Sequence, residues 1–310
     1  MTTARHLSPL RYPGGKARLA PYLARVLASQ SATIDTYCEP YAGGAGAGLQ
    51  LLADGYVNKL LINDLNPGVA AFWRSVFFDT EAFVALVADC PVDIHNWHRQ
   101  RAIYLAPDDH SDLALGLATF FLNRTNRSGI LNARPIGGLE QTGTWLIDAR
   151  FNKPNLLHRI RTLGELSPQV DVRQERAIEL LRTLNRRSRP VFLYVDPPYV
   201  VPGEELYMTD HSWSEHERLK RVLTNSPHPW ILTYDADDRT RDLYRHFRCL
   251  RFRIAHTAQV QKVGREFMFF SRGLRVPDRH VMRDEGTWVP AKARGLGAHH
   301  LDARTLAHEA

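Results

Sequence analysis

The sequence has few cysteines and no long apolar run. Its three cysteines, Cys38, Cys90 and Cys249, stand far apart, so their spacing forms neither a disulfide framework nor a zinc motif. It contains no apolar stretch of about eighteen residues, the length that a membrane-spanning helix needs. The first residues, MTTARHLSPLRYPGGK, lack the apolar core of a secretory signal. These absences predict a cytoplasmic protein without a membrane span, a disulfide or a bound metal.

Positive charge is in modest excess. The 310 residues include 40 Lys and Arg against 33 Asp and Glu, which gives a net charge of +7. This excess favours an anionic partner such as nucleic acid, although an arginine-rich proteome gives the same balance. The hydrophobic fraction of 44% is ordinary for a protein with a substantial core. The length suits one large domain or a domain with an insertion.

Apolar periodicity predicts strands that alternate with helices. We expect strands at 33–38, 59–64, 169–174, 191–196, 230–235, 250–257 and 265–272. We expect helices at 18–30, 49–55, 177–184, 214–223 and 239–247, and a mostly helical stretch at 68–165. This alternation indicates an α/β fold with a doubly wound parallel sheet, and the last two strands indicate an antiparallel edge. Residues 277–310 show little periodicity, which predicts a mobile C-terminal tail.

A glycine-rich turn, CEPYAGGAGAG, follows the first expected strand. Gly43, Gly44 and Gly46 allow the backbone to turn tightly and to approach a ligand. The next strand ends at Asp64, and an acid at this place hydrogen-bonds the ribose of a nucleoside cofactor. The pattern predicts such a cofactor; a strand-to-helix turn without a ligand is the alternative. A dinucleotide is disfavoured because the turn is not a clean G-x-G-x-x-G.

A second glycine element, RYPGGKARL, precedes the first expected helix. Free N–H groups of Gly14 and Gly15 at a helix start can hold an anion such as a carboxylate, and Lys16 adds a positive charge. A simple entry turn into the helix is the alternative.

An apolar strand ends abruptly in the stretch LYVDPPYV. Prolines cannot donate to a sheet, so the strand stops at Asp196, ahead of Pro197, Pro198 and Tyr199. A plain Asp-Pro-Pro turn would explain the end of the strand, but the other motifs give it a second meaning.

Together these motifs resemble the Dam-type adenine-specific DNA methyltransferases. The resemblance rests on LRYPGGK, CEPYAGGAGAG, LLINDLNP, FFLNRTNRSGIL, RFNKP and LYVDPPYV, in the family's order over residues 8–272. It implies a Rossmann-like sheet that binds S-adenosyl-L-methionine (AdoMet) and site-specific methyl transfer to the N6 amine of adenine in DNA. It also implies a discontinuous catalytic domain, residues 1–67 and 166–276, with a target-recognition insertion at 68–165.

The resemblance also implies roles for individual residues. Asp196 matches the catalytic acid, Pro197 lies beside it, and Tyr199 matches the ring that stacks on the target base. The implied cofactor contacts are Tyr12, Lys16, Tyr41, Gly43, Gly44, Gly46, Asp64 and Asp196.

The chemistry of an aromatic amine agrees with this assignment. The amine is a poor nucleophile because its lone pair is delocalised into the ring. Asp196 and the Pro197 carbonyl could accept its two N–H groups, and the fixed φ of proline would aim that carbonyl outward. Tyr199 offers a face for a base rotated out of the duplex. The sulfonium of AdoMet is already a good leaving group, so no metal is needed.

Basic residues gather in the expected insertion. Residues 123–161 carry seven Arg and Lys against two acids, which fits a surface that faces phosphates. We expect DNA contacts at Asn126, Arg127 and Arg134, and a β-ribbon over 130–152 that would fit the major groove. A solvated basic face is the alternative for any single arginine.

Several alternatives stay open at this stage. A cytosine-N4 methyltransferase uses the same signature, a non-catalytic DNA-binding relative would keep the fold, and a nicotinamide-dependent oxidoreductase has a similar sheet. The expected partner is double-stranded DNA, for a monomer or a weak dimer. A restriction–modification system with a cognate restriction enzyme, a phage and an orphan regulatory role are all compatible with the sequence.

Overall fold

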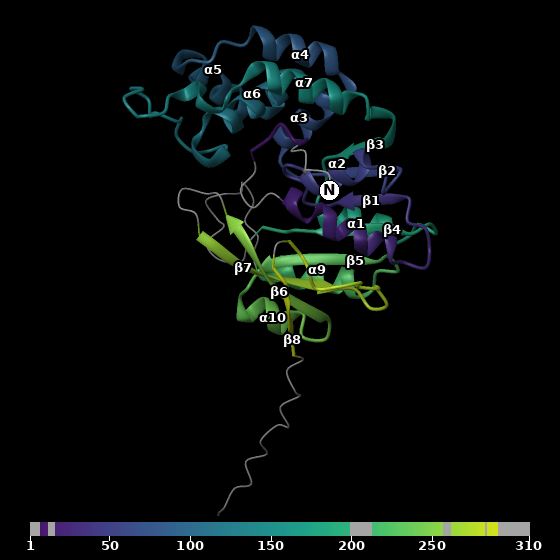
Figure 1. Ribbon diagram of the computed structural model, residues 1–310. Helices are drawn as coiled ribbons and strands as arrows, with labels where there is room; N and C mark the ends of the chain where they lie inside the picture. The colour runs from purple at the N-terminus through teal and green to yellow at the C-terminus, as the bar shows by residue number, and fades with distance from the viewer. Residues whose placement is uncertain (1–6, 12–15, 199–212, 257–261, 283, 291–310) are drawn as a thin grey trace, which may run out of the picture.

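A computed structural model describes the chain from residue 7 to residue 290, except for residues 12–15, 199–212, 257–261 and 283. Eight strands of this part form one sheet in the order β3-β2-β1-β4-β5-β7-β6-β8 (Figure 1). The strands are β1 (Thr36–Glu39), β2 (Lys59–Asn63), β3 (Val170–Arg173), β4 (Val191–Val195), β5 (Trp230–Asp235), β6 (Arg248–His256), β7 (Lys262–Phe270) and β8 (Thr287–Val289).

Five neighbouring strands pair in parallel, and the other three strands join the sheet through antiparallel pairings. β3, β2, β1, β4 and β5 pair in parallel, whereas β7 pairs antiparallel with both β5 and β6. The predicted doubly wound α/β sheet with an antiparallel edge is confirmed. The strand order reverses between β1 and β4, and such a switch point opens a crevice at the carboxyl ends of the strands.

Helices cover both faces of the sheet, which explains the apolar runs of its strands. Along β4, Phe192 and Tyr194 face the core that includes α1 (Ala20–Ala28) and α2 (Gly46–Ala53). Val191, Leu193 and Val195 alternate with them and face the opposite core, as the two-residue period of a strand requires. That second core contains α8 (Ala177–Leu184), α9 (Trp213–Thr224) and α10 (Asp238–Leu243).

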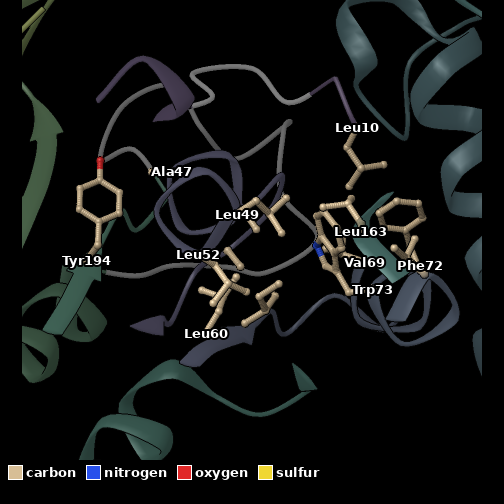
Figure 2. Packing of buried hydrophobic residues seen from close by; sticks show 14 of the residues in the cluster. Leu10, Ala47, Leu49, Leu52, Leu60, Val69, Phe72, Trp73, Leu163 and Tyr194 are labelled. Carbon is tan, nitrogen blue, oxygen red and sulfur yellow. The ribbon is translucent and has the colours of Figure 1, made fainter. Parts of the chain in front are cut away.

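A helical segment lies between β2 and β3. Its α-helices are α3 (Pro67–Phe78), α4 (Thr80–Asp89), α5 (Ile94–Leu105), α6 (Asp112–Thr125) and α7 (Lys153–Gly164). Phe72 contacts Trp73, Phe83 and Phe120 ring to ring. Figure 2 shows α3 side chains beside Leu163 of α7, and the same core continues to residues of the sheet layer. The predicted mostly helical stretch is therefore present and packs directly on the sheet layer.

The predicted β-ribbon over 130–152 is wrong. In this fully described stretch the backbone forms turns and a 3-10 helix, η4 (Ile147–Arg150). Its β-type pairing is limited to one isolated bridge between Asn126 and Pro135. Gly137, Gly138 and Gln141 have positive φ, which breaks an extended strand. The Gln141 side chain instead holds the loop by bonding to the backbone of Ile136, Gly138 and Ile147.

Part of the expected tail belongs to the sheet. Residues Thr287–Val289 form β8 and extend the edge at β6, although the sequence predicted no element after residue 277. Residues 291–310 lie outside the described part. Across the described ranges, the longest apolar helices are too short to cross a membrane.

Candidate active site

The carboxyl ends of the parallel strands gather four acids at one edge of the sheet. Glu39 ends β1, Asp64 follows β2, Asp196 follows β4, and Asp235 ends β5. Because these strands run in the same direction, their carboxyl ends meet at the switch point between β1 and β4. The two motifs that the sequence singled out, the glycine turn and Asp-Pro-Pro, therefore lie at the same edge.

Lys16 lies between two carboxylates that are far from it in sequence. Its Nζ is 3.0 Å from Oδ2 of Asp196 and 3.2 Å from Oε1 of Glu266. Lys16 is 6% exposed and Glu266 is 0% exposed, so water screens these charges weakly. The structure thus brings the predicted Lys16 and Asp196 together and adds Glu266, which the sequence did not indicate.

The other oxygen of Asp196 is held from β5. The hydroxyl of Thr233 donates to Asp196 Oδ1 over 2.7 Å, and the Tyr194 hydroxyl lies 3.0 Å from the Thr233 hydroxyl. Thr233 and Tyr194 are buried. Both carboxylate oxygens of Asp196 therefore have a fixed partner, and their direction is set by two buried strands and by Lys16.

Burial and mutual repulsion change the acidity of the neighbouring carboxyls. Burial raises the pKa of Glu266 to about 7, Lys16 opposes the rise, and Asp196 adds to it. Burial raises the pKa of Asp235 to about 6, again against Lys16 and with Asp196. Asp235 and Glu266 also face each other in the β5–β7 register. One lysine therefore offsets the charge of three carboxyls, and the pKa values of two of these are raised toward neutral pH.

The glycine turn is tied to Asp64 and to the helical segment. Gly43 has a φ of 46° and donates its N–H to Asp64 Oδ2 over 2.9 Å. Asn66 N–H donates to the other oxygen, Oδ1, at 2.9 Å. Burial raises the pKa of Asp64, and these two N–H groups oppose the rise. Trp73 of α3 donates to the Gly43 carbonyl at 2.9 Å.

The two glycine elements meet in space. A Cβ added at Gly46 would lie 2.9 Å from Cβ of Ala17, so the glycine turn packs against the 3-10 helix η1 (Lys16–Leu19). Gly44 lies in the same turn and is buried. Tyr41, however, packs against the core on the opposite face of the sheet.

Asn63 joins three loops at this edge, a role that the sequence did not reveal. It is fully buried at the end of β2. Its amide donates to the carbonyl oxygens of Pro40 and Glu175, and its Oδ1 accepts the N–H of Glu175. The loops after β1, β2 and β3 are therefore held in one arrangement.

Comparison with known families shows which family the chain belongs to. A model of the D12 class N6 adenine-specific DNA methyltransferase family matches residues 12–259. The chain belongs to the D12 class of N6 adenine-specific DNA methyltransferases. It is thus an enzyme that methylates the N6 amine of adenine in DNA, as the resemblance predicted. A comparison with curated proteins finds no match.

Some predicted site residues of the methyltransferase cannot be placed. Tyr12 and Tyr199 lie outside the described residues, as do Gly14 and Gly15. Pro197 is described and buried directly after Asp196. Among the residues that can be placed, no group of three or more His, Cys, Asp and Glu side chains could hold a metal ion.

The three predicted DNA contacts differ in their surroundings. Asn126 is fully buried; its amide donates to the carbonyls of Ile130 and Leu131, and its Oδ1 accepts from Trp97 at 2.7 Å. It therefore shapes the loop from inside and is not placed to contact DNA. Arg127 and Arg134 are exposed neighbours, because the N–H of Arg127 donates to the Arg134 carbonyl at 3.0 Å.

Proposed function

We propose that this methyltransferase takes its methyl group from AdoMet and holds the amine of the target adenine at Asp196. The observation that supports the proposal is the position of Asp196 at the switch point, with Lys16 on one carboxylate oxygen and Thr233 on the other. A fixed carboxylate can stabilise positive charge as it develops, without first having to reorganise.

The residues at this edge fit AdoMet. Asp64 offers an acceptor for ribose hydroxyls beside the glycine turn of Gly43, Gly44 and Gly46. Lys16 can hold the carboxylate of the methionine part, and Asp196 is an anion near which a sulfonium is favourable. Tyr12 completes the cofactor contacts that we propose, whereas Tyr41 is left out because it packs against the opposite core. When bound, AdoMet supplies an electrophilic methyl group on a good leaving group.

Asp196 and Pro197 act on the amine of the adenine. Asp196 accepts one N–H and the Pro197 carbonyl accepts the other, which draws the nitrogen toward a tetrahedral shape and localises its lone pair. Asp196 then stabilises the positive charge that forms on the nitrogen during transfer. Tyr199 stacks on the base once it has left the duplex, because the amine is unreachable inside the stack.

The helical segment supplies the contacts to double-stranded DNA in this proposal. Residues 68–165 form the target-recognition insertion, and residues 1–67 and 166–276 form the catalytic domain. Arg127 and Arg134, which are exposed and joined by a backbone hydrogen bond, are the proposed contacts to DNA. In the described residues neither guanidinium has a carboxylate partner, so both are available to a phosphate or a base edge.

The proposal is tested by following labelled methyl groups from AdoMet into unmethylated DNA. The product is digested to nucleosides and identified by mass spectrometry. We expect N6-methyl-2′-deoxyadenosine. Sequencing of the modified DNA then gives the target sequence. Methylcytosine would overturn the assignment of the base, and failure to bind AdoMet would overturn the assignment of the cofactor.

The substitution Arg134→Ala should weaken or respecify DNA binding and leave AdoMet affinity intact. The reason is that Arg134 is exposed on the helical segment and makes no side-chain contact with the described cofactor edge. A base contact is worth about 1–3 kcal/mol of discrimination. Binding of target and scrambled duplexes, together with an AdoMet titration, measures both effects. An equal fall in AdoMet affinity would contradict the proposed division into domains.

A further inference from the structure

Four arginines from separate parts of the chain converge beside the N-terminal segment. Arg124 of α6 donates from Nε to the Arg150 carbonyl at 2.7 Å and from Nη1 to the Pro9 carbonyl at 3.4 Å. Arg159 of α7 donates to the Ser8 carbonyl at 3.2 Å. Arg11 donates to the Asn126 carbonyl at 3.3 Å. We call Arg11, Arg124, Arg150 and Arg159 the arginine cluster.

The arginine cluster has no carboxylate partner in the described part of the chain. Among the residues that the structure describes, none of its guanidiniums forms an ion pair with a carboxylate. Burial lowers the pKa of Arg124, and the positive charges of the other three members lower it further. Two other arginines of the helical segment do have carboxylate partners: Arg74 pairs with Asp112, and Arg161 pairs with Glu81.

Uncompensated charge of this kind points to a ligand. Burying a guanidinium without an opposite charge is costly, and like charges nearby add to the cost. Backbone carbonyls satisfy some of the donors in the cluster but do not neutralise it. Planar guanidiniums with several fixed N–H groups match the oxygens of a phosphate. The chemistry thus favours a phosphate group of the DNA backbone over a neutral partner.

The backbone of Arg11 is fixed beside the helical segment. Asn123 clasps Arg11 on both sides: its Oδ1 accepts the Arg11 N–H at 2.7 Å, and its Nδ2 donates to the Arg11 carbonyl at 2.8 Å. Gly129 lets this backbone approach closely, since a Cβ there would lie 2.2 Å from the Arg11 carbonyl oxygen.

We propose that the arginine cluster binds a phosphate of the DNA backbone. The inference deepens the proposed function, in which the helical segment contacts DNA, but the phosphate contact depends neither on AdoMet nor on catalysis.

The substitution Arg150→Ala is the sharpest test. The Arg150 side chain is exposed, and the bonds from Arg124 go to its main-chain carbonyl, which the substitution keeps. We expect weaker binding to target and non-target duplexes alike, and a fall of about 1 in the slope of log affinity against log salt.

Arg161→Ala is the matched control, because Arg161 is an exposed arginine of α7 that is paired with Glu81. We expect it to keep the wild-type salt slope. An equal salt slope in the two variants would overturn the phosphate site. If Arg150→Ala loses binding of inorganic phosphate but keeps the wild-type affinity for DNA, the cluster is a site for a free anion. That outcome would also overturn the proposal.

The salt slope is measured without AdoMet, which keeps this test separate from the proposed function. An enzyme that fails to bind AdoMet can still show the phosphate contact.

Discussion

Asp196→Asn should lower kcat for DNA methylation by about 10³-fold, the scale of losing one preorganised charge in a catalytic site. The amide keeps the shape of the side chain and can still accept from the Thr233 hydroxyl. It removes the negative charge that would stabilise the amine in the transition state. Single-turnover methyl transfer measures the chemical step, and an AdoMet titration reports whether the cofactor site remains.

Asp237→Asn is the matched control for that result. Asp237 is an acid near the same edge that caps α10 by accepting the N–H of Arg239. Asparagine caps a helix about as well as aspartate, so the enzyme should stay folded and active. A loss of activity as large as that of Asp196→Asn would show that the loss of either negative charge at this edge abolishes activity. That result would contradict the specific role proposed for Asp196.

Lys16→Met should destabilise the fold by about 3 kcal/mol, the lower end of the range for breaking a buried ion pair. The change leaves Glu266 and Asp196 near each other without the cation that lies 3.2 Å from one and 3.0 Å from the other. Chemical unfolding near pH 8 measures the loss. AdoMet affinity should fall as well, because the proposed partner of the methionine carboxylate is removed.

The cost of Lys16→Met should depend on pH. The pKa of Glu266 is about 7 in the folded state against an ordinary value of 4.5. Between these values the folded state holds a proton that the unfolded chain releases, so the free energy of unfolding falls as pH rises through this window. Lys16 lowers this pKa, so its removal extends the window upward. The variant should lose more stability relative to the wild type at about pH 8 than at about pH 6.

The double variant Lys16→Met, Glu266→Gln checks the cause. It removes the buried charge that Lys16 had balanced, so most of the stability lost at the higher pH should return. If the double variant is as unstable as Lys16→Met, the loss comes from packing of the lysine stem and the argument from charge is wrong.

The parts of the site that the sequence predicted are local in the chain. Gly43 and Asp64 could be inferred because a glycine turn after one strand and an acid after the next strand meet in every doubly wound sheet. Asp196 and Lys16 were indicated by their own short motifs. The sequence could not show that Lys16 Nζ reaches Asp196, because the two are joined only through the folded sheet.

Thr233 and Glu266 escaped notice for a related reason. Each lies in an apolar strand where a polar residue carries no motif, and Glu266 reaches the site through the antiparallel pairing of β7 with β5. The expected β-ribbon failed because turn glycines and Gln141 bend the chain before a ladder can form. Asn126 was predicted as a DNA contact because it lies in a segment rich in basic residues, but its own amide points into the loop.

The helical segment has a consequence for how the chain folds. β2 ends at Asn63 and β3 begins at Val170, yet the two strands pair residue for residue. Closing so long a loop before any contact forms would be slow. Helices α3 and α7, however, pack against each other, and α3 also contacts β3. Once these helices associate, β3 is brought to β2 across a short effective distance, so we expect the helical segment to act as a template on which the sheet is completed.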